Sequence, residues 1–223
     1  MKDAELFQKI HEIIASGWSR MPDEHQGTGA PGLYLEQLVG LSVSSSDTPD
    51  AGRWELKYCS GSALLTLLHK TPQPRGSVRY LIEKFGWKGQ NGRPSFRHTI
   101  KGKSDRGFKI VPDGESVLVA HPAHTGPVPH WSSDVLINHF GGKLRRLLVV
   151  RGERKKRQVR YLSVTAYQEF LFSGFLDALA SGLIAVDFDA YLKESGAVRD
   201  HGTKFRVSPN DIGKLYKEQY HIH

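Results

Sequence analysis

Cysteine is almost missing from the sequence: Cys59 is the only one in 223 residues. A single thiol cannot close an internal disulfide, and the paired cysteines of a structural zinc ribbon are missing as well. No apolar run approaches the ~20 residues of a membrane-spanning helix, and the N-terminal stretch has the pattern of an amphipathic helix, not a signal peptide. These absences argue against a secreted disulfide scaffold and a membrane protein, and we expect a cytoplasmic protein with no membrane partner.

Acidic residues are fewer than basic residues in this sequence. The chain has 31 Lys and Arg against 23 Asp and Glu, for a formal net charge of +8, while 39% of its residues are hydrophobic. That balance is too apolar for a disordered chain, so we expect a packed globular fold. The excess of cations favours polyanionic partners, with nucleic acid first.

Helical and strand patterns alternate along the chain, which predicts a mixed α/β fold. Helices are expected at 3–15, 33–41, 77–85, 134–139, 167–180 and 210–220, and strands at 53–58, 63–70, 97–101, 108–111, 116–120, 144–150, 159–164, 183–188 and 204–207. No linker is long enough to separate independent domains. We therefore expect one domain over residues 1–223.

The segment from Pro49 to Lys57 contains the most informative chemistry. On a strand, Glu55 and Lys57 point to the same face, and the preceding loop is long enough to fold the Asp50 carboxylate back toward them. Two carboxylates and the Leu56 carbonyl form an oxygen ligand set for a hard divalent cation, and Lys57 can orient or help deprotonate a water. An ordinary exposed carboxylate–lysine pair explains the spacing equally well.

Further motifs add to this one. The segment matches the PD-(D/E)xK nuclease signature, and a helix that carries Glu36 precedes it. With these two features together, the chain resembles the MvaI/BcnI family of restriction endonucleases, a MutH-like branch of these nucleases. The other similar segments are Gly17-Trp18, Gly27-Thr28-Gly29, Asp47-Thr48-Pro49-Asp50, Leu64 to Pro72, Pro74-Arg75-Gly76 and Asp200 to Val207.

The resemblance implies a restriction-endonuclease-like fold, a mixed sheet flanked by helices. Two lobes around DNA remain an alternative to one undivided domain, a catalytic lobe including 30–90 and a recognition lobe including 95–215. The implied catalytic set is Glu36, Asp50, Glu55 and Lys57. The implied cofactor is Mg²⁺, which Mn²⁺ can replace, bound by Glu36, Asp50, Glu55 and Leu56.

The resemblance also implies a function. We expect a type II restriction endonuclease of the bacterial cytoplasm that hydrolyses double-stranded DNA at a specific site. It would act as a monomer that cuts the two strands in succession, beside a separately encoded DNA methyltransferase. Two alternatives stay open: a MutH-like strand-nicking enzyme of mismatch repair, and a DNA-binding module without catalysis.

Several basic and histidine residues are candidates for DNA contact. Arg206 can pair with guanine O6 and N7, and His201 can bond a base edge, although each can instead contact a phosphate or a surface acid. The full set of expected DNA-binding residues is His69, Lys70, Arg75, Lys101, Arg106, Asp200, His201, Lys204 and Arg206.

Two further features have an ordinary interpretation beside a functional one. The basic connection 151–158 is either a solvated hairpin tip or a phosphate-binding segment. His121, His124 and His130 have no metal-ligand spacing, so we expect an irregular loop there and no zinc site.

Overall fold

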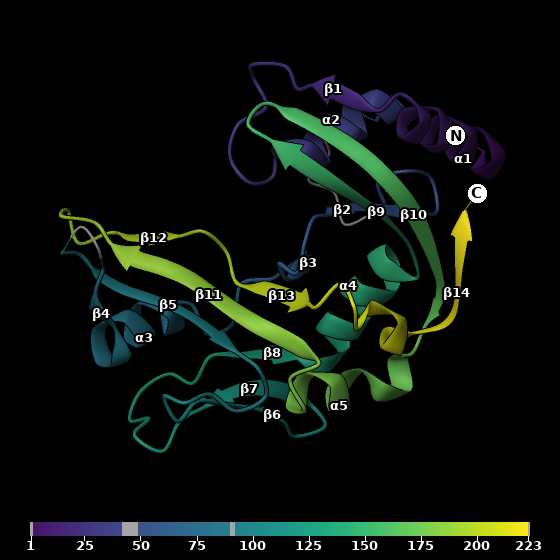
Figure 1. Cartoon of the computed structure of the whole chain (residues 1–223). Coiled ribbons are helices and arrows are strands. Elements are labelled where there is room, and N and C mark those ends of the chain that lie inside the picture. Colours follow the sequence, from purple (N-terminus) through teal and green to yellow (C-terminus); the bar gives the residue numbers. More distant parts are fainter. Residues whose placement is uncertain (1, 42–48, 90–91, 223) are drawn as a thin grey trace. The chain divides into compact units, whose positions relative to one another are not determined.

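The computed structural model describes residues 2–41, 49–89 and 92–222, so the similar segment Asp47-Thr48 lies outside the described residues. The chain divides into two compact units, each assembled from separate stretches of sequence (Figure 1). Unit 1 comprises Met1–Leu65, His139–Leu171 and Ser208–His223, and unit 2 comprises Thr66–Asn138 and Phe172–Val207. The strands of each unit pair across long sequence separations.

Unit 1 contains a five-stranded mixed sheet. Its strands are β1 (Trp18–Arg20), β2 (Glu55–Cys59), β9 (Arg146–Lys155), β10 (Gln158–Phe170) and β14 (Tyr216–Ile222). The order is β1-β10-β9-β2, with β14 also paired to β10, and β2 runs parallel to β9 while the other pairs are antiparallel. β2 ends this order, and among the described residues β9 is its one strand partner; the site described below lies at β2.

Two helices cover one face of this sheet. Helices α1 (Asp3–Ala15) and α2 (Ala30–Val39) place Leu6, Ile10 and Leu35 in one buried cluster with Leu56 and Leu148 of the sheet. Side chains alternate between the two faces of a strand, so Glu55 and Lys57 point to the opposite face. The helices thus supply the hydrophobic core and leave the other face for polar chemistry.

Unit 2 contains two sheets. The larger has the order β3 (Leu65–His69), β13 (Lys204–Val207), β11 (Ile184–Leu192), β5 (Pro94–Ile100) and β4 (Trp87–Lys88), with β12 (Val198–Asp200) paired to β11. The smaller comprises β6 (Lys109–Pro112), β7 (Ser116–Ala120) and β8 (His130–Ser132). Its helical segments are α3 (Ser77–Phe85), η1 (Phe172–Gly174) and α5 (Phe175–Ala180), and buried aromatic rings such as Phe96, Phe108 and Phe188 fill its core.

Four expected elements have the bounds that the sequence indicated: α1, α3, β7 and β13. Helix α4 (Ser133–Leu144) is longer than the expected 134–139, and the unit boundary falls within it. No helix among the described residues is long and apolar enough to cross a membrane.

The expected helices 167–180 and 210–220 are wrong, and one pairing explains both errors. Strand β10 continues to Phe170 and only 175–180 is α-helical, while 210–220 consists of a short 3₁₀ turn, η2 (Ile212–Leu215), and strand β14. The two strands pair with each other, with Tyr167 opposite Gln219. The hydrogen bonds of that long-range ladder override the local helical pattern.

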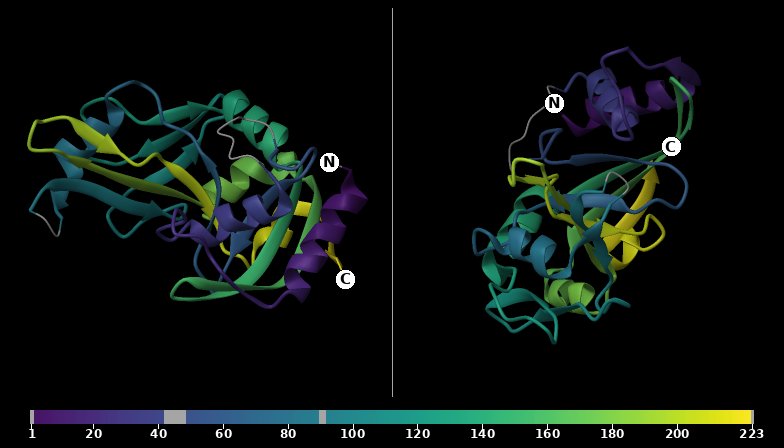
Figure 2. Two further views of the ribbon diagram at one scale, coloured as in Figure 1. Left: turned by 90° about the horizontal axis from the view of Figure 1, so that it is seen from above. Right: turned by 90° about the vertical axis from the view of Figure 1, so that its left-hand side faces the viewer.

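The expected connection 151–158 is also wrong. Strands β9 and β10 extend through it and leave a two-residue turn, Lys156-Arg157, between Lys155 and Gln158. The pair forms a long curved hairpin that can be followed in Figure 1 and in the left-hand view of Figure 2. The basic residues therefore extend along two strands, not along a loose loop.

Candidate active site

A tight turn brings Asp50 back to the start of β2. Ala51 and Trp54 exchange two backbone hydrogen bonds of 2.9 and 3.1 Å, and Gly52 between them has a left-handed φ of 67° that glycine adopts readily. The backbone N–H of Leu56 then donates to Oδ2 of Asp50 at 3.4 Å. The turn thus places the Asp50 carboxylate beside the strand that carries Glu55 and Lys57.

Glu55 is a fully buried acid between two lysines. Its Oε1 forms ion pairs with the ammonium groups of Lys57 and Lys143, the latter at 3.7 Å, whereas no described residue donates a hydrogen bond to Oε2. Burial raises the pKa of Glu55 to about 7; the charge of Lys57 opposes this rise and that of Asp50 adds to it. Burial penalises the charged form of this carboxyl group, so binding of either a proton or a cation would stabilise it.

Glu36 belongs to the same electrostatic cluster. It lies in α2 and is half-buried, and burial is the main reason why its pKa is raised above the ordinary value. The Asp50 charge raises it further, while Lys57 and Lys143 lower it. Unit 1 therefore brings together all four residues of the expected catalytic set.

Lys143 is the member that the sequence analysis missed. It lies in the last turn of α4, and only 16% of its side chain is exposed. No motif surrounds it, and 85 residues separate it from Lys57 in the sequence. Only the fold, which brings the end of α4 to the β2 edge, identifies it.

The donor set of this cluster suits a hard divalent cation, because it consists of carboxylate and backbone oxygens. The Oε2 atom of Glu55, buried without a hydrogen-bond donor in the described chain, is an oxygen that such a cation would satisfy. Within the described ranges, however, no three His, Cys, Asp or Glu side chains are close enough to enclose a metal. The residues fit Mg²⁺ in the kind of oxygen ligand that they offer.

In unit 2, the C-terminal candidates lie on a polar face of the larger sheet. Arg206 donates to Oδ2 of Asp187 at 3.1 Å, and the hydroxyl of Thr99 donates to Oδ1 of the same carboxylate at 2.7 Å. Asp187 is nearly buried, so these contacts fix the position of the guanidinium.

A second acid on β11 organises the neighbouring cations. Asp189 forms ion pairs with Arg97 at 3.1 Å and with Lys204 at 3.7 Å. The sequence analysis did not select Asp187 or Asp189, although their alternation on β11 is a visible signal for a polar strand face.

His69 and the segment that begins at Asp200 lie together. The backbone N–H of Lys70 donates to the Thr203 carbonyl at 3.0 Å, and a side chain built at Gly202 would meet the His69 ring at 3.1 Å. His201 lies 6.0 Å from the Tyr191 ring. Two candidate segments more than 130 residues apart in sequence thus share one surface of unit 2.

The remaining DNA-binding candidates are exposed elsewhere in unit 2. Arg75 precedes α3, Lys101 follows β5, and the Arg106 guanidinium stacks over the Trp87 ring at 4.0 Å. Their roles stay predictions.

The three histidines considered for zinc have structural neighbours. His124 stacks on Tyr80 with ring centroids 5.5 Å apart, and His121 accompanies it in the loop that was expected. The loop expectation is wrong for His130, which belongs to β8 because its backbone pairs with Leu118 and Gln73.

A mixed sheet whose edge strand carries Glu-x-Lys, with an aspartate folded against it and a helical glutamate nearby, has the architecture of the restriction-endonuclease-like enzymes. The comparison with family models agrees. The chain belongs to the MvaI/BcnI restriction endonuclease family, whose model matches residues 7–216.

Solved structures show the same fold. The chain is similar to a restriction endonuclease MvaI in complex with its cognate DNA substrate, with a TM-score of 0.82, 23% identity and complete coverage of both chains. It is also similar to MvaI in the absence of DNA, with a TM-score of 0.58 and 24% identity over 100% of this chain and 99% of that one. The comparison with curated proteins gave no match. The family and the fold class expected from the sequence are confirmed.

Proposed function

We propose that this member of the family is a Mg²⁺-dependent type II restriction endonuclease that hydrolyses both strands of duplex DNA at a specific site. The observation that carries the proposal is the convergence of Glu36, Asp50, Glu55 and Lys57 at β2. Family membership supports the class of reaction. The acid–lysine cluster supports the PD-(D/E)xK chemistry.

The acids and the lysine of this cluster have different roles in phosphodiester hydrolysis. Asp50, Glu55 and the Leu56 carbonyl would hold Mg²⁺, with Glu36 beside them, and the bound ion would neutralise charge on the scissile phosphate. The ammonium of Lys57, held by its ion pair with Glu55, orients the attacking water and stabilises the developing negative charge. Mn²⁺ has compatible ligand preferences and would replace Mg²⁺.

Residues of unit 2 would recognise the DNA base sequence. Asp187 holds Arg206 on the polar face, where Arg206 can reach the major-groove edge of guanine, and Asp189 pairs with Lys204 beside it. His69 and His201 lie on the neighbouring surface and would contact further base edges. Lys70, Arg75, Lys101, Arg106 and Asp200 would contact the backbone or position these readers.

One chain supplies one catalytic cluster, so one strand is cut at a time. We propose a monomer that cuts the second strand after release or reorientation on the duplex, and that works in the bacterial cytoplasm beside a separately encoded methyltransferase. The net charge of +8 favours retention near DNA between the two cuts.

Digestion of a supercoiled plasmid of known sequence with Mg²⁺, followed by sequencing of the ends, tests the proposal. An open-circle intermediate should accumulate before linear product, at a rate first order in enzyme. Accumulation that stops at the open circle would indicate a MutH-like nicking enzyme. No cleavage in Mg²⁺ or Mn²⁺, with DNA binding intact, would indicate a binding module.

A further inference from the structure

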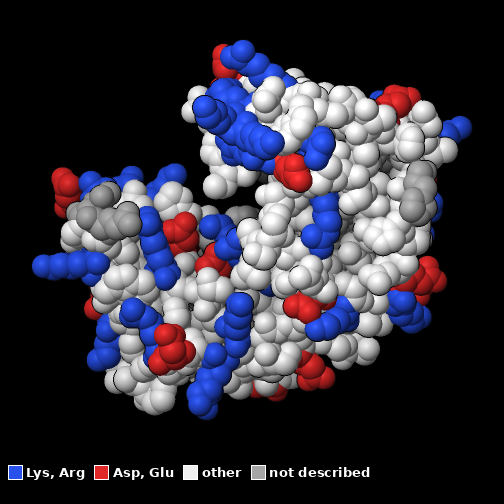
Figure 3. All heavy atoms as spheres, in the orientation of Figure 1, with Lys and Arg blue, Asp and Glu red and all other residues white. Residues whose placement is uncertain are grey.

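The hairpin of β9 and β10 concentrates positive charge. Residues 151–160 contain six cationic side chains and one acidic one, a net +5 out of +8 for the whole chain. A dense group of Lys and Arg side chains is visible at the end of this hairpin (Figure 3). The proposed chemistry at β2 uses none of these residues.

This charge lies on the same sheet face as the catalytic residues. Glu55 pairs with Leu147 and Lys57 with Val149, so Arg151, Glu153 and Lys155 follow on that face of β9. Across the ladder, Gln158 pairs with Lys155 and Arg160 with Glu153, and β1 adds Arg20 opposite Gln158 and Trp18 opposite Arg160. A continuous strip of one sheet face therefore joins the active site to the hairpin tip.

Internal contacts fix the tip. Arg154 donates to the Gly27 carbonyl at 2.6 Å and to the Lys156 carbonyl at 2.9 Å, and Arg157 donates to the Pro22 carbonyl at 2.6 Å. These two arginines hold the turn against the segment that follows β1. The backbone that carries Lys155 and Lys156 is therefore held in place before any partner binds, which lowers the entropy cost of binding.

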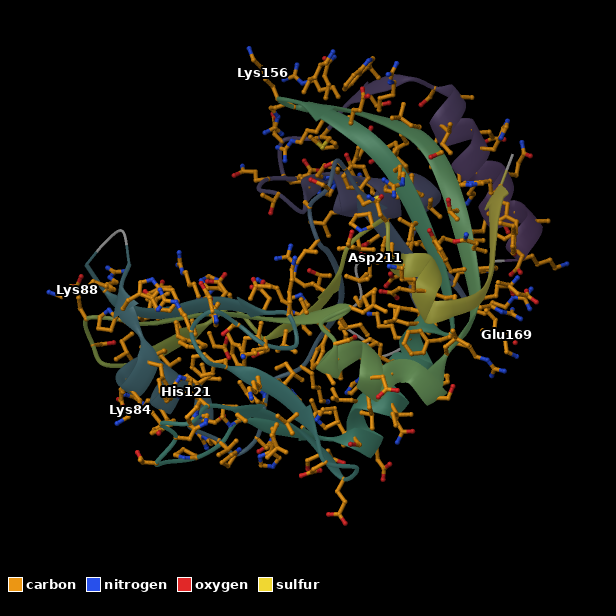
Figure 4. All side chains as sticks on the ribbon, turned by 60° about the horizontal axis from the view of Figure 1, so that its bottom comes forward. Lys84, Lys88, His121, Lys156, Glu169 and Asp211 are labelled. Atoms are coloured by element: carbon orange, nitrogen blue, oxygen red, sulfur yellow. The ribbon has the colours of Figure 1, made fainter. Side chains whose placement is uncertain are left out.

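Other cations of the tip remain on the surface. Arg20, Lys155 and Lys156 are exposed, and the Lys155 ammonium lies 5.0 Å from the centroid of the Trp18 ring. Lys156 extends outward from the turn (Figure 4) and adopts a left-handed φ of 54°, a conformation that glycine would adopt with less strain. The exposed Arg20, Lys155 and Lys156 thus present their charges to solvent at the tip.

We propose that Arg20, Lys155 and Lys156 form a docking surface for the phosphates of duplex DNA that flanks the target site. Lys155 lies six positions along β9 from Val149, the neighbour of Lys57, which is roughly 20 Å at 3.3 Å per residue. Duplex DNA advances 3.4 Å per base pair, so for a duplex that runs along β9 the contact falls about six base pairs from the scissile phosphate. This inference rests on the proposed function for the position of the scissile bond.

The first test measures binding without cleavage. Fluorescence anisotropy gives the affinity for a generic 30-base-pair duplex in EDTA as salt is varied, for the wild type, Lys155→Ala/Lys156→Ala and a control, Lys2→Ala/Lys9→Ala. The control removes the same charge from α1, which covers the opposite sheet face. The hairpin variant should lower the slope of log K against log salt by about 1.8 and weaken binding about tenfold or more at 0.1 M salt. A slope equal to that of the wild type, or an equal loss in the control, would overturn the proposal.

The second test locates the contact. Duplexes carry the site identified by plasmid digestion with either 3 or 12 base pairs on each side, and kcat/KM is measured on both. The wild type should prefer the long flanks, whereas Lys155→Ala/Lys156→Ala should cut both equally and match the wild type on the short duplex. A wild type indifferent to flank length would contradict the docking surface. If no DNA is cut, the proposed function fails, while the binding test still decides whether the hairpin binds duplex DNA.

Discussion

The catalytic residues of unit 1 and the polar face of unit 2 both have acids and cations at alternate strand positions, but the two sets differ in how far they are exposed to solvent. Glu55 is fully buried with two lysines, whereas Asp189 keeps 32% of its side chain exposed and its partner Arg97 keeps 57%. Exposed pairs contribute little to stability and can exchange partners, while a buried acid is costly unless it is compensated. The difference indicates that burial constrains the whole Glu55 cluster in unit 1, whereas in unit 2 it constrains the Arg206–Asp187 pair and leaves the pairs of Asp189 partly exposed to solvent.

The largest expected effect comes from the buried cluster. Asp50→Ala or Lys57→Ala should reduce Mg²⁺-dependent cleavage by at least about a thousandfold, since each removes a group that acts on the reacting phosphate or water. DNA binding in Ca²⁺ should persist, because the expected base and phosphate contacts lie on other residues. Plasmid cleavage time courses and anisotropy measure the two properties.

Lys2→Ala provides the control for cleavage, because it removes an exposed charge at the start of α1. Cleavage by Asp50→Ala at the wild-type rate would remove this residue from the catalytic set.

The buried acid should also make stability depend on pH. Glu55 has a pKa of about 7 in the folded chain against an ordinary 4.5, so the folded state retains the proton that the unfolded state releases between those values. Stability therefore falls as pH rises from 4.5 to 7, by up to about 3 kcal/mol. In EDTA, Glu55→Gln should gain stability relative to the wild type over this window, as measured by urea unfolding at pH 5 and pH 8. A difference that stays constant between the two pH values would show that burial does not penalise the Glu55 charge.

The polar face should control discrimination between sequences. If Arg206 reads a base, Arg206→Ala should lose about 1–3 kcal/mol of preference for the cognate site over a site with one mismatch. Lys155→Ala/Lys156→Ala should instead weaken all sequences alike. Competition binding in Ca²⁺ measures both, and the reverse pattern would move sequence recognition from unit 2 to the hairpin.

The catalytic motif could be predicted from the sequence because its geometry is local. Asp50, Glu55 and Lys57 lie within eight residues, and strand alternation with one tight turn is enough to bring them together. Lys143 could not be predicted in this way, because only the packing of the α4 end against β2 brings it to Glu55.

Long-range pairing also explains what was missed elsewhere. The strand character of 216–222 depends on β10, a partner about fifty residues earlier, and the residues themselves carry no strand alternation. Likewise, Arg206 and Lys204 could be selected as cations, but their acid partners follow only from the register of β11 with β13.

The smallest expected effect separates charge from backbone strain at the hairpin tip. Lys156 has a φ of 54°, where a side chain costs of order 1 kcal/mol that glycine avoids, so Lys156→Gly should unfold at slightly higher urea concentration than the wild type. If the lysine is there for its charge, the same variant should bind generic duplex DNA more weakly and lower the salt slope by about 0.9. A Lys156→Arg variant keeps the charge and the strain, and should match the wild type in both measurements. Tighter or unchanged DNA binding by Lys156→Gly would show that the Lys156 charge does not contact DNA, and would remove this residue from the docking surface.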